Sequence, residues 1–535
     1  MKAHIFLMAC SLLLFISCQD SVETPTEVLL PETKATLSPD ERFGALFETV
    51  QLARIFPHSK TFSDCIPKQS TDQILQAYEL RRSAPDFDLS IFIGKHFSCT
   101  HKKGVQLKRD TNRSLLQHIN AYWSILTPQS KVEESGSLIA LPHPFVLSSS
   151  KASEVYYWES YFTMLGLAAA GKEELLENMV DNFTHLIHEF GHIPSANRRY
   201  QLSRTGAPFY AAMIDLLASR KGARVYENYL SALEKEYQFW MKGRFEVNPE
   251  EPASKRVVRM QDGSLLNRYF DHLSKPRPEA YLEDIELAKG LRRNTRRVYE
   301  DIRAACESGW QFSSRWFGDE QYMASIHTTQ MIPIDLNSLL YHLEITLSKA
   351  YGAHGDEEQK ENYLQRAENR KRALEKHCWD AQRSIFLDYN FIRRSRSEVP
   401  SLAMLYPLYF NLANQEQADS IASFVQQYFL KPGGVVTTLN QTGQDWDAPH
   451  GWAPLQWITI QGLRNYGHLP LADTIQQRWV DLNTRVYKNS GKLLDKYNVE
   501  DMTLEDGGGE PQSLDAYAWT NGILLQLLNE KKQTQ

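Results

Sequence analysis

Residues 173–190, EELLENMVDNFTHLIHEF, carry the pattern that decides the fold of this chain. Their apolar residues recur at intervals of three and four, which places them on one face of an α-helix. This face consists of Leu175, Leu176, Met179, Val180, Phe183, Leu186, Ile187 and Phe190. Gly191 follows directly and is typical of a residue that ends a helix. The stretch predicts an amphipathic helix that packs one side against a core.

The same helical period recurs along most of the chain. It is found near residues 209–241, 279–305, 334–351, 357–378, 418–430 and 514–530. Alternating strand patterns are scarce, and residues 435–438 (VVTT) are too short for more than a β-bridge. No Pro- or Ser-rich linker follows residue 38. We therefore predict that residues 39–535 form a single all-α domain.

Composition narrows the class of partner. The chain has 535 residues and a formal net charge of −6, from 59 basic and 65 acidic residues. No strongly basic face is indicated, so we do not expect a nucleic-acid partner. No CxxC pair occurs, so no zinc site is expected. For the four cysteines after residue 38, a bridge between Cys65 and Cys99 is one possibility and four independent buried thiols are the other.

Residues 1–17 indicate an export signal. Lys2 precedes an apolar run at residues 5–16 that is too short to remain in a membrane as a spanning helix. The ending FISC, up to Cys18, resembles the lipobox of bacterial lipoproteins, in which the cysteine is lipidated; an ordinary signal peptide cleaved nearby is the alternative. Residues 18–38 are rich in Thr, Glu and Pro and predict a flexible tether. We expect an exported protein, periplasmic or anchored in the outer membrane, that contacts the membrane only through its lipid.

Residues 445–454, DWDAPHGWAP, are too polar and too aromatic for a simple connecting loop. Two carboxylates lie among two tryptophans, and Trp457 follows closely. Aromatic rings pack against the C–H faces of sugars, and carboxylates accept hydrogen bonds from sugar hydroxyls. The pattern suits carbohydrate binding, although a tryptophan-rich segment taken alone more often belongs to a core.

This string resembles QWDxPxGWAP, a signature of the trehalases, glycoside hydrolase family 37, with Asp445 in place of the family's Gln. Further segments resemble trehalase motifs in the same order along the chain: residues 155–167, 191–198, 275–279, 307–316, 494–499, 507–510 and 519–522. The resemblance implies an (α/α)6 toroid that hydrolyses α,α-trehalose to two glucose molecules with inversion. It also implies a disaccharide as the partner, no cofactor and no metal, and we expect a monomer.

The two catalytic positions of the family are altered here. In an inverting glycosidase one carboxylic acid protonates the glycosidic oxygen, and one carboxylate activates a water. The acid position, Asp in the family's ESGWDFSS, is Gln311, and an amide cannot deliver a proton. The base position, Glu in the family's EKYDV, is Asp495, which is one methylene shorter. Because a displacement of about 1 Å can cost on the order of 10²-fold in rate, impaired hydrolysis is expected.

The resemblance also assigns substrate-binding positions. Three differ from the family: Lys151 replaces the first Arg of PGGRFRE, Glu159 replaces the Asp of YYWDSYF, and Ser195 replaces the first Asn of GHIPNGNR. The positions that keep the family residue are Trp158, Arg204, Arg277, Glu279, Trp446, Asp447, Trp452 and Glu510. Asp445 is either a new active-site carboxylate or a change tolerated at the surface, and we prefer the second interpretation.

Two hypotheses follow from these residues. The first is an exported trehalase-type enzyme that works slowly, with Asp495 as base and an acid that the sequence does not identify. The second is a catalytically inactive disaccharide-binding or sensing protein on the same scaffold. Gln311 favours the second hypothesis, whereas the retained binding positions agree with both.

Overall fold

The computed structural model describes residues 37–99, 107, 112–128, 135–291, 293–505, 507–508, 515 and 517–534. The predicted export signal with Cys18, almost all of the tether, and Glu510 lie outside this part of the chain. Within it, no helix is both long and apolar enough to cross a membrane.

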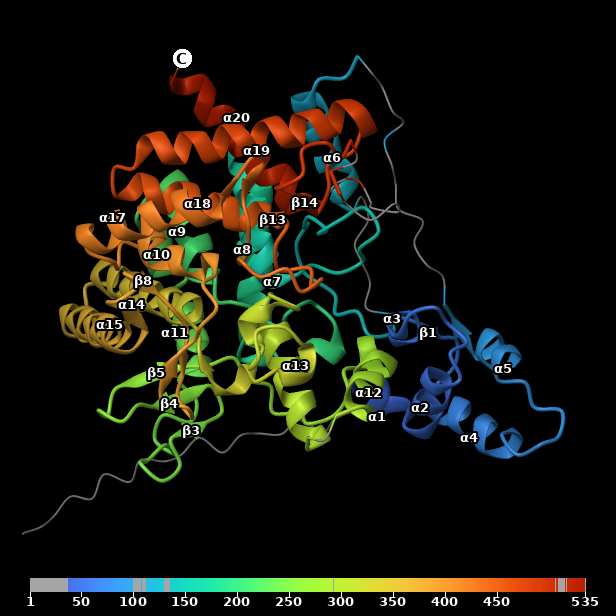
Figure 1. The fold of residues 1–535 in the computed structure, drawn as a ribbon. Helices are drawn as coiled ribbons and strands as arrows, with labels where there is room; N and C mark the ends of the chain where they lie inside the picture. Colours follow the sequence, from blue (N-terminus) through green and yellow to red (C-terminus); the bar gives the residue numbers. More distant parts are fainter. Residues whose placement is uncertain are drawn as a thin grey trace, which may run out of the picture.

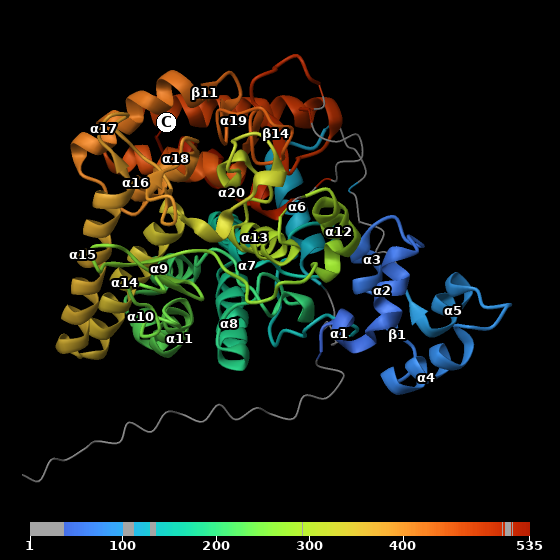
Figure 2. The ribbon, with the colours of Figure 1, turned by 60° about the horizontal axis from the view of Figure 1, so that its bottom comes forward.

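Six helices close into a ring. In chain order they are α7 (Tyr157–Ala169), α9 (Tyr210–Lys221), α14 (Ile334–His354), α16 (Tyr406–Tyr409), α18 (Ala453–Asn465) and α20 (Ala518–Thr534). Each helix contacts the next one, and α20 returns to contact α7 (Figures 1 and 2). These inner helices are therefore shielded by neighbours on both sides, which is why α7 and α18 are apolar on nearly all faces.

A second set of helices alternates with the inner ones along the chain and lies outside them (Figure 2). These are α6 (Leu115–Leu126), α8 (Glu173–Phe190), the pair α10 (Arg224–Asn228) and α11 (Leu230–Trp240), α15 (Glu357–Cys378), α17 (Gln415–Phe424) and α19 (Leu469–Ser490). Six hairpins of one outer and one inner helix make an (α/α)6 toroid. The predicted all-α fold class is confirmed.

Residues 173–190 form helix α8. Most of its predicted apolar stripe is buried, while Leu175 and Phe190 are half-buried at the two ends. The helix ends at Gly191, whose φ of 76° lies in the left-handed region. The ring closes tightly where α7 meets α20, because a Cβ on Gly166 would lie 2.3 Å from the Cα of Gly522. Glycine at both positions lets these two backbones touch.

Some predicted helices are divided in the structure. The run at 209–241 contains three helices, and the run at 279–305 contains α12 (Tyr281–Lys289) and α13 (Thr295–Ser308). The run at 418–430 becomes α17 followed by a π-helical turn at Val425–Phe429. The apolar period continues through these breaks, so periodicity alone does not reveal them.

The described N-terminal residues have an apolar core of their own. Helices α1 (Pro39–Phe43), α2 (Ala45–Leu52), α3 (Ser59–Ser63), α4 (Thr71–Arg81) and α5 (Leu89–His96) surround this cluster and project from the ring (Figure 1). A disulfide joins Cys65 to Cys99, whereas Cys306 and Cys378 are free and buried. The bridge is thus the correct one of the two predicted alternatives. We call residues 39–99 the N-terminal lobe; it packs against α12.

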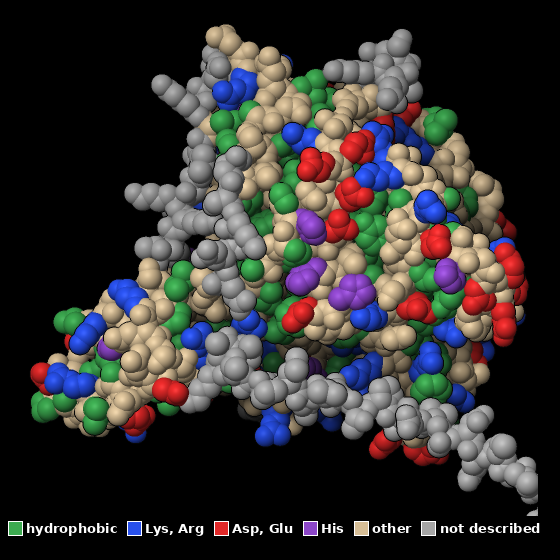
Figure 3. All heavy atoms as spheres, turned by 180° about the vertical axis from the view of Figure 1, so that it is seen from behind, with side chains coloured by type: hydrophobic (Ala, Val, Ile, Leu, Met, Phe, Trp, Pro, Cys, Tyr) green, Lys and Arg blue, Asp and Glu red, His purple; other side chains and the backbone are tan. Residues whose placement is uncertain are grey.

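The strands are two or three residues long. The pair that matters for the site is β13 (His450–Trp452) with β14 (Lys496–Asn498), which run antiparallel with Trp452 opposite Lys496. The others are β1 (Ile66–Pro67), β2 (Phe97–Ser98), β3 (Ala253–Ser254), β4 (Val257–Arg259), β5 (Leu265–Asn267), β6 (Met331–Ile332), β7 (Trp379–Asp380), β8 (Ile385–Phe386), β9 (Tyr389–Asn390), β10 (Ser395–Arg396), β11 (Leu430–Lys431) and β12 (Gly434–Val435). On the face drawn in Figure 3, acidic and basic side chains are interspersed.

Candidate active site

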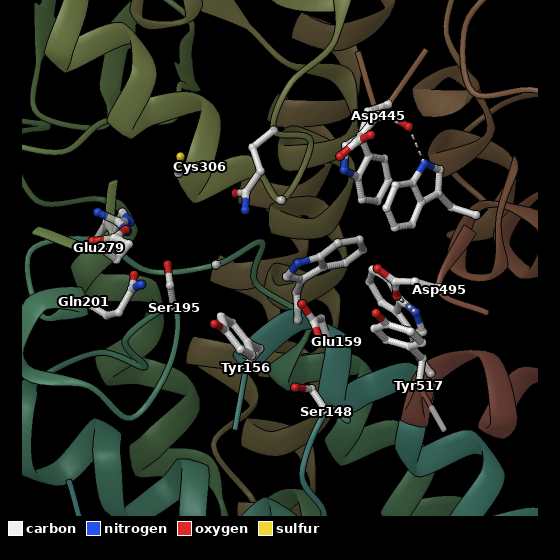
Figure 4. Close-up of a pocket in the computed structure, with 18 of the residues that line it drawn as sticks. Ser148, Tyr156, Glu159, Ser195, Gln201, Glu279, Cys306, Asp445, Asp495 and Tyr517 are labelled. Atoms are coloured by element: carbon white, nitrogen blue, oxygen red, sulfur yellow. Dashed lines mark hydrogen bonds and ion pairs between the residues drawn. The ribbon is translucent and has the colours of Figure 1, made fainter. Parts of the chain in front are cut away.

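A pocket of about 390 Å³ lies at the end of the ring where α7, α18 and α20 begin. Most of the predicted site residues line it (Figure 4). They are Trp158, Glu159, Ser195, Arg204, Arg277, Glu279, Gln311, Trp446, Trp452 and Asp495. Segments that lie far apart in the sequence therefore meet in this pocket. Its volume suits a small polar ligand.

Tryptophans form one half of the pocket. The rings of Trp446 and Trp452 stack at 4.2 Å with an interplanar angle of 4°. Trp519, on the first turn of α20, meets Trp452 edge-on at 5.7 Å. Trp158 packs against Trp519 at 5.4 Å and against Trp446 at 5.8 Å. Such flat and rigid faces suit the C–H surface of a pyranose ring.

Asp495 lies beside these tryptophans in the segment between α19 and α20. The indole Nε1 of Trp519 donates a hydrogen bond to its Oδ1 at 2.8 Å. Burial raises the pKa of Asp495 to about 7, although the Trp519 hydrogen bond and the nearby Lys496 ammonium act in the opposite direction. A carboxylate with a pKa near neutrality is suited to take a proton from a water.

Glu159 is on the first turn of α7, next to Trp158. Among the described residues its carboxyl has no hydrogen-bond or ion-pair partner, and it lines the pocket. Burial raises its pKa to about 8, and the negative charges of Asp495 and Glu154 add to the shift. Glu159 therefore keeps its proton at neutral pH.

Charged and amide side chains form the other half of the pocket. Arg204 makes an ion pair with Glu279 through Nη2. Its Nε and Nη1, together with Oε2 of Glu279 and Oε1 of Gln201, are buried and have no hydrogen-bond partner among the described residues. Buried polar atoms are rarely left unpaired, so these four are available to bind a hydroxyl of a ligand or an ordered water.

Arg277 is held by the protein itself. Its guanidinium donates to Asp284 through Nε at 2.9 Å and through Nη2 at 2.6 Å. Its Nη1 donates to Sγ of Cys306 at 2.9 Å, and Cys306 also lines the pocket. Arg277 thus builds the wall, with most of its donors already used.

Two of the predicted residues do not line the pocket. Lys151 is exposed. Asp447 is fully buried, where it accepts hydrogen bonds at 2.8 Å from the hydroxyls of Ser313, Ser314 and Thr438. Asp447 therefore ties its loop to the segment that follows Gln311.

Sequence reasoning missed several lining residues. Trp519 lies in residues 519–522, which resemble a family motif, so the sequence does carry a signal for it. Lys60 comes from the N-terminal lobe, and nothing in its local sequence points to a site. Asp445 is an exposed residue at the pocket rim, where it makes an ion pair with Lys496, the first residue of β14. It is therefore at the surface and at the site, which the two interpretations had treated as alternatives.

No group of three or more His, Cys, Asp or Glu side chains in the described residues is arranged to hold a metal ion. The chemistry that the pocket offers is that of carboxyl groups, aromatic faces and hydrogen-bond donors.

Comparison with known proteins agrees with this geometry. A family model described as Trehalase matches residues 54–532. The structure is similar to neutral trehalase Nth1 from Saccharomyces cerevisiae, with 22% identity and a TM-score of 0.60, over 79% of this chain and 80% of that chain. It is also similar to the GH63 mannosylglycerate hydrolase from Thermus thermophilus, with 14% identity and a TM-score of 0.50, over 77% of this chain and 99% of that one. The two structural matches concern the fold, and the family match covers most of the sequence. The chain belongs to the trehalase family.

Proposed function

We propose that this trehalase-family glycoside hydrolase cleaves α,α-trehalose, or a closely related α-glycoside, slowly and with inversion. The observation that carries the proposal is the placement of Asp495, which Trp519 holds at 2.8 Å in a pocket walled by tryptophans. A carboxylate in this position is suited to activate a water against the anomeric carbon of a sugar stacked on those rings.

The rate is expected to be low because Gln311 stands at the position of the family acid. Loss of the acid from its usual position costs up to about 10²–10⁴-fold, and a base that is one methylene short adds to this cost. We expect glucose release from trehalose to be at least about a thousandfold slower than in an ordinary trehalase. Turnover at an ordinary trehalase rate would contradict the proposal.

A disaccharide-binding or sensing protein without catalytic activity is the second candidate. Gln311 favours it, and so do the unpaired buried atoms of Arg204, Glu279 and Gln201, which offer binding without chemistry. Calorimetric titration with trehalose distinguishes these two candidates from a protein that neither cleaves nor binds the sugar. If no heat is detected, the sensing candidate is removed.

The double variant Gln311→Asp with Asp495→Glu tests whether acid and base limit the rate. We expect it to release glucose faster than the wild type by at least about 10²-fold. If the wild type binds trehalose and the double variant gains no activity, the altered binding positions are limiting instead. Mannosylglycerate belongs in the substrate panel because a structurally similar hydrolase is named for it.

We further propose that the chain is exported, lipidated at Cys18 and monomeric. The composition of residues 1–38 supports export, and the Cys65–Cys99 bridge suits an oxidising compartment. Labelling cells with a fatty acid and comparing the wild type with Cys18→Ser tests the anchor. A label that persists in the variant would contradict it, and light scattering of the purified chain tests the monomer.

A further inference from the structure

Four carboxyl groups are among the described residues that line the pocket: Glu159, Glu279, Asp445 and Asp495. Two of them are already neutralised by a neighbouring cation. Arg204 pairs with Glu279 and keeps the pKa of this carboxyl below its usual value although it is buried. Lys496 pairs with Asp445 at the exposed rim. Of these four described carboxyl groups, Glu159 and Asp495 are therefore the two left for proton transfer.

Positions 159 and 495 differ from the trehalase motifs in side-chain length, in opposite directions. Position 159 carries Glu where the motif has Asp, so its carboxyl reaches one methylene further. Position 495 carries Asp where the motif has Glu, so its carboxyl reaches one methylene less. The combined length of the two side chains is unchanged. Compared with the motifs, the longer of the two side chains is on α7, and position 311 no longer carries a proton donor.

The location of Glu159 fits a role at the bond between two sugars. In Figure 4 its carboxyl is drawn between a polar group that contains Ser195, Gln201 and Glu279 and the aromatic side with Asp495. A disaccharide that places one ring on the tryptophans and the other on the polar group has its glycosidic oxygen between the two. The Glu159 carboxyl has no hydrogen-bond or ion-pair partner within the described ranges, so its proton is not engaged elsewhere.

We propose that Glu159 is the proton donor that replaces the acid missing at Gln311; the inference rests on the proposed hydrolase function. As the bond between the anomeric carbon and the glycosidic oxygen breaks, its electron pair passes to that oxygen, which takes the proton of Glu159. A water adds its oxygen to the anomeric carbon and gives one proton to the Asp495 carboxylate. Two free sugars leave, and transfer of one proton from Asp495 to Glu159 restores the starting state.

The charges around the pair agree with these roles. Burial raises the pKa of Asp495 to about 7 and that of Glu159 to about 8, so between these values Asp495 is ionised and Glu159 is protonated. Among the described residues, the charged neighbours are Asp495 and Glu154 for Glu159, and Lys496 and Asp445 for Asp495. Activity is expected to rise with pH through about 7, as Asp495 loses its proton, and to fall through about 8, as Glu159 loses its own.

Two substrates separate a proton donor from a positioning residue. The leaving group of trehalose is a sugar alkoxide that needs a proton, whereas α-D-glucosyl fluoride releases fluoride, which needs little help from an acid. For Glu159→Gln we expect kcat on trehalose to fall by about 10²-fold or more, while hydrolysis of the fluoride stays within about 10-fold of the wild type. Glu159→Asp should retain part of the trehalose activity, and the alkaline limb of its pH profile should persist, whereas Glu159→Gln should lose that limb.

The control is Glu174→Gln, which removes an exposed carboxyl from α8, outside the pocket. Equal losses on both substrates in Glu159→Gln would overturn the assignment, because this result marks a positioning residue. Trehalose hydrolysis at the wild-type rate in Glu159→Gln would also overturn it and leave the hydrolase function intact. A wild type that hydrolyses the fluoride but not trehalose would show that no acid operates. A wild type that hydrolyses neither would remove the proposed function together with this inference.

Discussion

The indole of Trp519 and the carboxylate of Asp495 are joined by a hydrogen bond of 2.8 Å from Nε1 to Oδ1. Trp519 is the second residue of α20, and its ring packs edge-on against Trp158 and Trp452. One side chain thus orients the candidate base and closes the aromatic wall that would receive the sugar. Replacement of its N–H alone separates these two contributions.

Trp519→Phe keeps an aromatic ring but removes the donor. The hydrogen bond lowers the pKa of Asp495 against the effect of burial, so its loss should raise that pKa above about 7. A hydrogen bond to a charged group contributes about 1.5–3 kcal/mol, which corresponds to roughly one to two pH units. We expect the acidic limb of the pH profile for glucose release to move to higher pH by this amount.

Trp457→Phe is the matched control for this prediction. The Nε1 of Trp457 donates to Tyr409 at 3.3 Å, away from the pocket lining. The pH profile of the Trp457→Phe variant should match that of the wild type. An acidic limb that stays in place in Trp519→Phe would mean that the hydrogen bond does not tune Asp495.

Arg204 should matter for binding more than for turnover. Its Nε and Nη1 are buried and have no partner among the described residues, so a bound sugar would supply the missing acceptors. Arg204→Ala loses these contacts and leaves Glu279 unpaired, and we expect calorimetric affinity for trehalose to fall by about 10–150-fold, from about 1.5–3 kcal/mol for a charged hydrogen bond. Arg220→Ala, which breaks an exposed ion pair with Glu173, should leave affinity unchanged. Unaltered affinity in Arg204→Ala would place the ligand elsewhere in the pocket.

How much of this site could be predicted depends on whether a residue acts through its own motif or through contacts from distant segments. Trp158, Glu159 and Asp495 lie in motifs that the sequence displays, and the structure brings them together. The Glu159 carboxyl has no partner in the described part of the chain. This depends on which side chains of α7 and α20 lie beside it, and the local sequence does not show that. Asp447 shares a motif with two pocket tryptophans, yet hydroxyls from another loop bury it fully.

The fold shows the same division. The period of α8 predicted its buried face and its end at Gly191, because both depend on neighbouring residues. The apolar core of the N-terminal lobe and the reach of Lys60 into the pocket depend on packing between segments far apart in the sequence. Periodicity shows that one face of a helix is buried, but it does not show which surface of the protein covers that face.

The disulfide should stabilise the N-terminal lobe. The bridge between Cys65 and Cys99 closes a segment with a sequence separation of 34, next to a small apolar cluster. A loop of this size corresponds to about 3–4 kcal/mol of stabilisation by restriction of the unfolded chain. We expect Cys65→Ser with Cys99→Ser to speed amide hydrogen exchange in the lobe and to leave exchange in α14 unchanged. Equal exchange in the lobe would contradict a stabilising role, and Cys378→Ser controls for the loss of a buried thiol.

Glu236 is a buried carboxyl with which no cation among the described residues pairs. The hydroxyl of Tyr157 donates to its Oε1, and its Oε2 is buried without a partner in the same part of the chain. Burial raises the pKa of Glu236 to about 8, although the Tyr157 hydrogen bond lowers it. The folded protein therefore holds a proton here at neutral pH, whereas the unfolded chain, with the ordinary value of 4.5, does not.

This difference makes Glu236 a pH-dependent cost to stability. Between pH 4.5 and about 8 the folded state binds the extra proton, so the free energy of unfolding falls as pH rises, by up to about 1.4 kcal/mol per pH unit. Glu236→Gln imitates the protonated side chain and removes this dependence. We expect the melting temperature of the variant to be close to that of the wild type at about pH 5 and several degrees higher at about pH 8. Because Glu159 and Asp495 titrate in both proteins, their contributions cancel in the comparison. A difference in melting temperature that is the same at both pH values would show that Glu236 does not gain its proton on folding.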